Sequence, residues 1–191
     1  RCPTTFNFAF MHSSENRAKA LSRSVYDFVV VSLHSARQLE KKYPEVMLVS
    51  TFEDSLYSPP FVLAASRPEH TAIQTGDRIA ADPNSNDPYS ITMELCAGKN
   101  VTILPVPYLA TGTMLASGEV DFVVRRTNEI PDDIRQLPIS ATANTAMTIP
   151  ALLVNRYNYG IDPILRKYLD CPLIAGVQRD VIDGKKDAEF Y

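Results

Sequence analysis

Short apolar runs alternate along the chain with amphipathic stretches of helical length. Continuous runs rich in β-branched and aromatic residues are typical of strands that are buried on both faces. The strands expected on this basis are 6–11, 27–32, 46–50, 61–66, 78–81, 101–105, 120–125 and 151–155. Helices are expected at 17–24, 35–42, 109–117 and 164–169, with another that begins at Asp87 and ends before Gly98. This alternation predicts an α/β fold whose sheets are mostly parallel.

Two of the expected strands share a core sequence. Residues 25–32 (VYDFVVVS) and 119–126 (EVDFVVRR) both contain Asp-Phe-Val-Val. Each follows a helix, and each lies downstream of a strand, a polar turn and a helix. The repeated plan predicts two lobes, and a cleft between two α/β lobes is a preferred place for a ligand.

A polar turn over residues 82–87 (DPNSND) separates an expected strand from an expected helix. It lies at the carboxyl end of a strand and before a helix N-terminus, where free N–H groups and the helix dipole favour anions. Ser85 and Asn86 add hydrogen-bond donors, and residues 12–16 (HSSEN) form the counterpart in the other lobe. The same residue types also form ordinary turns by bonding their own backbone. The sequence therefore leaves a ligand site and a plain turn as equal alternatives.

Composition narrows the class of protein. The chain is 45% hydrophobic and 21% charged, which is close to the average for folded soluble proteins. Its net charge of −3 and the absence of a Lys/Arg block make it a poor candidate for gripping nucleic-acid phosphates. Three widely spaced cysteines without a C-x-x-C motif argue against a disulfide framework and favour a reducing compartment. No apolar run approaches the roughly 20 residues of a membrane helix, and a chain that opens at Arg1 is expected to be a fragment or a processed product.

Metal chemistry finds no support in the residue spacing. The three histidines are His12, His34 and His70, and none forms an H-x-H or H-x-x-x-H pair. A calcium loop starting at Asp82 fails because its sixth position is Asp87 instead of Gly, and its twelfth is Met93 instead of Glu. We therefore expect no metal and no cofactor.

Covalent catalysis is similarly unsupported. His12 precedes Ser13 and Ser14, but sequence neighbours seldom have the geometry of a nucleophile and its base. Cys96 falls within an apolar helix and is expected to be a core residue. We expect a protein that is not an enzyme.

Two further residues remain open at this stage. Arg125 ends the second repeated strand beside Arg126, at the same edge as the polar turn. It either binds an anion through its two-pronged guanidinium or is a solvated surface charge. Tyr108 either lines the cleft or packs in the core.

The order of these features resembles a known fold. The segment RIAADPNSNDPYSITMELCAGKNVTILPVPYLATGTMLASGEVDFVV resembles the second lobe of type 2 periplasmic-binding-protein folds, with a G-x-x-D turn before its last strand. The segment FNFAFMHSSENRAKALSRSVYDFVVVS resembles the matching part of the first lobe. Within that superfamily the chain is similar to the C-terminal domain of YhfZ-like bacterial transcriptional regulators, and the similarity covers most of its length.

The resemblance implies a domain plan and a role. Lobe one would comprise residues 1–66 and 148–191, and lobe two residues 67–147, with hinges near Ser66 and Ile149. The chain would be a cytoplasmic, homodimeric, ligand-sensing domain that makes no membrane contact. DNA would be bound only through an N-terminal helix-turn-helix segment absent from this chain.

The resemblance also places a ligand site in the inter-lobe cleft for a small polar ligand, anionic ligands included. The residues carried over to that site are Ser13, Ser14, Ser32, Ser85, Asn86, Asp87, Tyr108, Arg125 and Thr145. Two alternatives stay open: an extracytoplasmic solute-binding protein of a transporter, and an enzyme on the same fold that acts on a small metabolite.

Overall fold

The computed structural model describes residues 6, 7, 9, 11–52, 54–158, 160–182, 185 and 186, without the side chains of 141–144 and 182. The chain divides into two compact units. Unit 1 comprises Arg1–His12, Arg17–Tyr57 and Ile149–Tyr191, and unit 2 comprises Ser13–Asn16 and Ser58–Thr148.

The helices and strands alternate as an α/β fold requires. In chain order they are α1 (Ser14–Ser22), β1 (Phe28–Ser32), α2 (Leu33–Lys42), β2 (Val46–Thr51), β3 (Phe61–Ala65), β4 (Arg78–Ala81), α3 (Asn86–Cys96), β5 (Thr102–Pro105), α4 (Tyr108–Ala116), β6 (Phe122–Arg126), η1 (Thr127–Glu129), β7 (Arg135–Pro138), α5 (Ala141–Thr148), β8 (Pro150–Asn155), α6 (Ile161–Tyr168) and α7 (Cys171–Ile182).

Unit 1 contains a sheet of three described strands in the order β1-β8-β2. Both β1 and β2 pair with β8 in the antiparallel sense, so the expectation of a mostly parallel sheet is wrong for the described strands of this unit. The returning strand β8 lies between β1 and β2 and separates them. A continuous apolar run such as β8, whose residues are all buried, indicates a central strand but does not reveal its direction.

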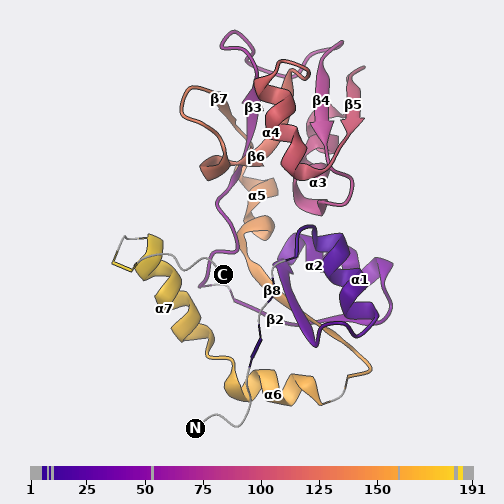
Figure 1. Ribbon diagram of the computed structural model, residues 1–191, viewed down its shortest axis with the longest axis vertical. Coiled ribbons are helices and arrows are strands. Elements are labelled where there is room, and N and C mark those ends of the chain that lie inside the picture. Colours follow the sequence, from indigo (N-terminus) through magenta and orange to yellow (C-terminus); the bar gives the residue numbers. More distant parts are fainter. Residues whose placement is uncertain are drawn as a thin grey trace. The chain divides into compact units, whose positions relative to one another are not determined.

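Helices cover both faces of this sheet (Figure 1). On one face α1 and α2 pack against β1 and β8 through a core that includes Leu21, Val31 and Leu153. On the other face α6 packs through Leu165 against Leu152 and its neighbours. The sheet is therefore buried on both sides, which explains its continuous apolar strands.

Unit 2 contains a five-stranded sheet in the order β5-β4-β6-β3-β7. Strand β4 is parallel to β5 and β6, whereas β3 is antiparallel to β6 and β7. The expected first lobe extended to Ser66, but the pairing of β3 places that strand in unit 2, and the units change between Tyr57 and Ser58. The second change lies between Thr148 and Ile149.

The two faces of the unit 2 sheet carry different helices (Figure 1). Ile91 and Cys96 of α3 and Met147 of α5 pack on one face against Phe122 and its neighbours. Leu115 of α4 packs on the other face. Cys96 is a core residue as expected, and burial raises the pKa of its thiol.

The two repeated Asp-Phe-Val-Val segments occupy comparable places in their units. Strand β1 pairs antiparallel with β8, the strand by which the chain returns to unit 1. Strand β6 pairs antiparallel with β3, the first strand after the chain enters unit 2. In each unit the repeated strand thus lies next to the crossing strand.

Several element boundaries differ from the expected ones. Helix α1 begins at Ser14 instead of Arg17, so part of the expected polar turn is helical. Residues 6, 7, 9 and 11 of the expected first strand lie in no strand, and Phe8 and Phe10 lie outside the described residues. Strand β7 and helices α5 and α7 have no counterpart among the expected elements.

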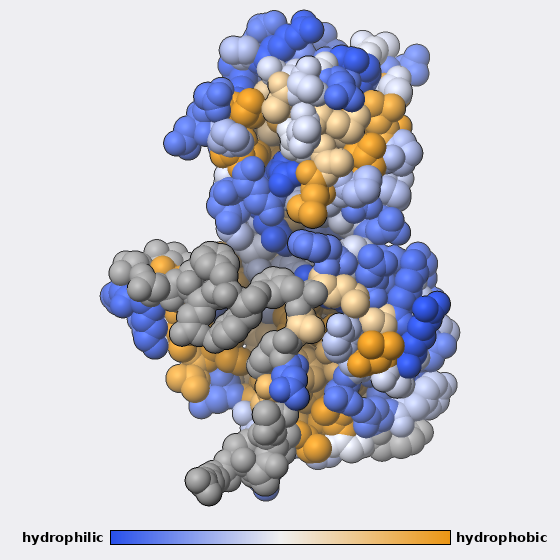
Figure 2. Space-filling view, in the orientation of Figure 1, coloured by the Kyte–Doolittle hydropathy of each residue, from blue (hydrophilic) through white to orange (hydrophobic). Residues whose placement is uncertain are grey.

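A pair of hydrogen bonds between one side chain of helix α7 and the backbone of another segment fixes this helix to unit 1. The amide of Gln178 accepts a hydrogen bond from the N–H of Leu56 at 3.1 Å and donates to its carbonyl at 3.0 Å. Within α7, Ala175 is buried. Leu173, Ile174 and Val177 reach the surface, where Figure 2 shows apolar residues on this helix. Of the helices in the described part, none has both the length and the apolar character needed to cross a membrane.

Candidate functional site

Three parallel strands of unit 2 end at the same edge of the sheet. Because β4 is parallel to β5 and β6, the carboxyl ends of all three point the same way. The segments that follow them are residues 82–87, 106–108 and 127–129. We call these segments, together with Arg125 and Arg126, the carboxyl edge. Ligands of open α/β sheets bind at such an edge.

Asp82 organises the carboxyl edge. Asp82 is buried, and its Oδ1 accepts a hydrogen bond from the backbone N–H of Asn84 at 2.9 Å. Its Oδ2 accepts from the hydroxyl of Ser85 and from the backbone N–H of Tyr108, both at 3.0 Å. One carboxylate thus closes the polar turn and also satisfies the first N–H of α4. Part of the polar turn therefore bonds to the protein itself.

The N-cap of α3 lies two residues before Asp87, the cap that the sequence predicts. Ser85, not Asp87, is the N-cap, and Pro88 is the third helical residue, where its missing N–H costs nothing. The Ser85 side chain makes no capping bond, and its hydroxyl donates to Asp82. Asp87 is buried in the first turn, where its negative charge complements the helix dipole.

Tyr108 and Arg125, which the sequence predicts for one site, lie in contact. The Arg125 guanidinium lies over the Tyr108 ring, with Cζ 4.8 Å from the ring centroid. Its Nη1 donates to the Tyr108 carbonyl at 3.1 Å and to the Thr111 hydroxyl at 3.0 Å. Its Nη2 lies 3.4 Å from Oε2 of Glu129. Arg125, only 12% exposed, is therefore an engaged and neutralised charge and not a solvated one.

Glu129 completes this cluster. The Tyr108 hydroxyl donates to Glu129 Oε2 at 2.5 Å, and Arg126 Nη1 lies 3.8 Å from Oε1 of the same carboxylate. Burial, followed by the hydrogen bond and the negative charge of Glu129, raises the pKa of Tyr108 far above its usual range. Tyr108 thus remains a neutral hydrogen-bond donor at physiological pH.

Gly112 makes room for Arg125. A Cβ at this position would lie 3.1 Å from Arg125 Nη1, closer than ordinary van der Waals contact. The glycine in the middle of α4 lets the guanidinium lie against the helix. Neither Gly112 nor Glu129 carries a sequence signal that marks it as part of a site.

The remaining predicted site residues have local roles. Ser32 is buried at the end of β1, and its hydroxyl caps α2 by accepting from Ser35 N–H at 2.9 Å.

Ser13 has a positive φ of 72°, and its hydroxyl accepts from Asn16 N–H at 3.3 Å at the start of α1, where Ser14 is the first helical residue. Ser13 belongs to unit 2, and its Oγ also donates to the carbonyl of Asn84 in the same unit. Thr145 is exposed on α5, and its carbonyl accepts from Thr148.

The charges at the carboxyl edge nearly balance. The two basic side chains there are those of Arg125 and Arg126, and the three acidic ones are those of Glu129, Asp82 and Asp87. Two buried carboxylates beside the start of α3 oppose a bare anion there and favour a ligand group that carries N–H or O–H donors. Across the part of the chain that the structure describes, no three His, Cys, Asp or Glu side chains gather as metal ligands.

Solved structures of the same fold are numerous. The crystal structure of YhfZ from Shigella flexneri aligns with a TM-score of 0.71 and 18% identity over 95% of this chain and 79% of that chain. The alkanesulfonate-binding protein SsuA from Xanthomonas axonopodis pv. citri, bound to MOPS, aligns with a TM-score of 0.65 and 14% identity over 91% and 62% of the two chains. The periplasmic sulfonate-binding protein SsuA from Methylobacillus flagellatus KT, part of a putative transporter, aligns with a TM-score of 0.60 and 17% identity over 83% and 51%.

These similarities confirm the predicted α/β fold of the periplasmic-binding-protein type. Comparison with curated proteins gives no match. The model of one family, the YhfZ C-terminal domain, matches residues 2–190, nearly the whole chain. The chain therefore belongs to the family of YhfZ C-terminal domains.

Proposed function

We propose that this chain is a small-molecule-binding domain that holds a polar ligand at the carboxyl edge of unit 2. The observation that carries the proposal is the start of α3, at which the N-cap Ser85 gives its hydroxyl to Asp82 and makes no capping bond. Ser85 therefore does not cap the first turn of α3, and the N–H groups at a helix N-terminus suit an oxygen atom of a ligand.

The chemistry of the edge defines the ligand further. Asp82 and Asp87 are buried carboxylates, and the Tyr108 hydroxyl is kept protonated beside Glu129. Such an edge suits a small molecule with hydroxyl or amine groups as well as acceptor oxygens. Two proteins of the same fold have been solved with MOPS and with β-D-galacturonate, which are molecules of this general kind.

The biological role that we propose is effector sensing. In this proposal the domain belongs to a cytoplasmic, homodimeric bacterial transcription regulator and binds its ligand without turnover, while a segment outside this chain contacts DNA. The net charge of −3 and the lack of a basic block are consistent with a domain that leaves DNA contacts to another segment. A solute receptor of a transporter is the second candidate, because one protein of the same fold is a periplasmic sulfonate-binding protein and another is an alkanesulfonate-binding protein.

Calorimetric titration with MOPS, galacturonate, cystine, inorganic phosphate and a neutral sugar tests ligand binding. Asn86→Ala removes the amide side chain at the first position of α3, and Asn100→Ala is the matched control, because Asn100 is exposed outside the site. Loss of one ligand hydrogen bond weakens binding by about tenfold. Affinity that Asn86→Ala leaves unchanged, or a panel without any binder, would contradict the proposal.

The role is tested on the natural gene product in its own cells. Its N-terminal sequence and intact mass show whether a basic helix-turn-helix segment or a cleaved secretory signal precedes this domain. The first result, together with analytical ultracentrifugation that shows a dimer, supports the regulator. The second supports the receptor. Mass spectrometry of the ligand after incubation tests the expected absence of turnover.

A further inference from the structure

Arg17 of α1 is held in place by neutral groups of unit 1. Its Nε donates to the Met11 carbonyl at 2.7 Å. Its Nη1 donates to the Val30 carbonyl and to the Tyr57 hydroxyl, both at 2.8 Å. These three bonds fix the guanidinium in a single orientation between the segment before α1 and the strand β1.

The Arg17 charge has no carboxylate partner among the described residues. Other arginines with interior positions do have one: Arg125 and Arg126 pair with Glu129. The part-buried Arg17 makes bonds to two carbonyls and a hydroxyl only. A charge withdrawn from water is normally paired, because its desolvation is costly. The unmatched charge in unit 1 is therefore a reason to expect an anion from outside the chain.

One nitrogen of Arg17 remains available to that anion. Nε and Nη1 use their N–H groups on the protein, whereas Nη2 has no acceptor in the described part of the chain. A rigid guanidinium with two open N–H groups suits the oxygen atoms of a carboxylate, sulfonate or phosphate.

We propose that Arg17 is an anion-binding residue of unit 1 and that it holds the oxyanion group of a small molecule. The proposal deepens the proposed function, on which it rests, by naming the ligand class: a small polar molecule that carries a carboxylate, sulfonate or phosphate.

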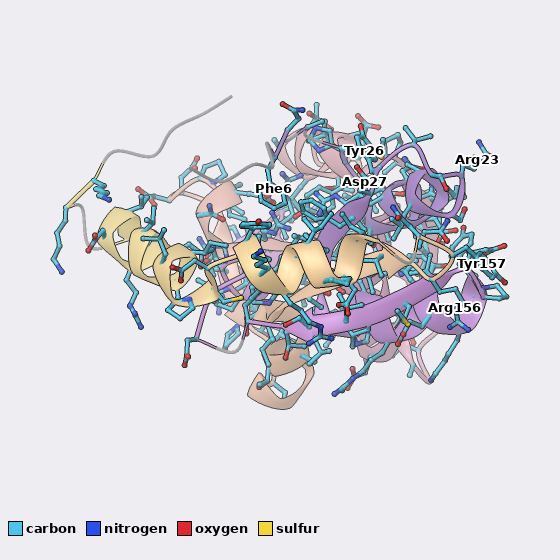
Figure 3. The ribbon with its side chains drawn as sticks, turned by 90° about the horizontal axis from the view of Figure 1, so that it is seen from below. Phe6, Arg23, Tyr26, Asp27, Arg156 and Tyr157 are labelled. Carbon is cyan, nitrogen blue, oxygen red and sulfur yellow. The ribbon has the colours of Figure 1, made fainter. Side chains whose placement is uncertain are left out.

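Titration of the whole chain with galacturonate, MOPS, inorganic phosphate and a neutral sugar tests this inference. The variants are Arg17→Gln, which removes the charge, and Arg17→Lys, which keeps the charge without the planar guanidinium. Arg23→Gln is the matched control, because Arg23 follows the same helix, is exposed and points outward at one end of unit 1 (Figure 3). Circular dichroism verifies that each variant is folded.

The wild-type chain supplies a second measurement that needs no variant. Phenylglyoxal modifies accessible arginines, and peptide mapping reports the rate at each one. The bound anionic probe is expected to slow the modification of Arg17 and to leave that of Arg23 unchanged. This result stands even where Arg17→Gln does not fold.

The expected result is anion binding that weakens at least about tenfold in Arg17→Gln, less in Arg17→Lys and not at all in Arg23→Gln. Equal affinity of folded Arg17→Gln and wild type, or no protection of Arg17 by a bound anion, overturns the inference. Binding of the neutral sugar alone, weakened by Asn86→Ala, also overturns it and leaves the proposed function standing. Absence of any binding overturns both.

Discussion

Oδ2 of Asp82 accepts a hydrogen bond from the backbone N–H of Tyr108 at 3.0 Å, across 26 positions of the chain. The bond joins the loop after β4 to the first residue of α4, which follows the neighbouring strand β5. The two loops are therefore parts of one rigid edge. The position of Tyr108, and with it the Arg125 contact, depends on this carboxylate.

Asp82→Asn tests this dependence. An amide accepts at one oxygen only, and its NH2 group would face a donor, the N–H of Tyr108 or of Asn84. Leaving a buried donor unsatisfied costs about 1–3 kcal/mol, so the free energy of unfolding should fall by that amount in urea titrations. Asp133→Asn, at an exposed position, is expected to change it by less than about 0.5 kcal/mol. Equal stability of the two variants would show that Asp82 does not organise the edge.

Tyr108 gives the domain a dependence on alkaline pH. An unfolded tyrosine ionises near about pH 10, whereas burial and Glu129 raise the pKa of folded Tyr108 above that value. Above about pH 10 the unfolded chain therefore releases a proton that the folded chain keeps, so the contribution of Tyr108 to stability falls as pH rises. Urea titrations at pH 7 and pH 10.5 should show a steeper loss for wild type than for Tyr108→Phe.

Spectrophotometric titration at 295 nm provides an independent measurement. The chain has nine tyrosines, and one of them should ionise in wild type only at higher pH or on unfolding. That late component should be missing from Tyr108→Phe. A wild-type titration without a late component would contradict the raised pKa.

The sequence predicted most strands because their apolar runs are continuous, but it could not predict their direction. The buried run of β8 suits a parallel or an antiparallel central strand equally well. Strand β7 (RQLP) was missed because three of its four residues are exposed and no apolar run marks it. At the candidate site, the place of the polar turn and of Tyr108 after strands made them predicted site residues. The hydrogen bond between Asp82 and Tyr108, and the lack of a carboxylate beside Arg17 among the described residues, depend on contacts between distant residues, which no local pattern reports.

Two helical glycines form a matched pair for testing the close approach of Arg125. Gly176 in α7 faces open space, so Gly176→Ala should raise the free energy of unfolding by about 0.5–1 kcal/mol through helix propensity. At Gly112 the new Cβ would lie 3.1 Å from Arg125 Nη1, and displacing the guanidinium offsets that gain. Gly112→Ala should therefore be less stable than Gly176→Ala. Equal stabilisation would mean that Arg125 moves without cost.

Asn155 at the end of β8 fixes the end of α1. Its Nδ2 donates to the carbonyls of Leu21 and Ser22 at 3.2 and 3.3 Å, and its Oδ1 accepts from Tyr157 N–H at 3.0 Å. Asn155→Asp would place a buried carboxylate against carbonyl oxygens and should lower the free energy of unfolding by about 3 kcal/mol at pH 7. The variant should recover part of this loss below about pH 5, where the carboxyl is protonated and again donates.

Asn158→Ala is the control for Asn155. Its side chain is hydrogen-bonded to Asp27 at 3.3 Å in an exposed position, so its removal should cost less than about 0.5 kcal/mol. A loss in Asn158→Ala as large as that in Asn155→Asp would show that the loop itself, and not the buried amide, determines stability.

The central place of β8 in unit 1 has a consequence for synthesis on the ribosome. Both β1 and β2 bond to β8 in the described sheet, yet β8 is translated about a hundred residues after β2. All five strands of the unit 2 sheet lie between β2 and β8 in sequence, so that sheet can form first. Until β8 is made, the edges of β1 and β2 that pair with it have no partner strand. Open edges of this kind recruit other chains. Nascent chains that stall before Pro150 are therefore the ones most in need of a chaperone.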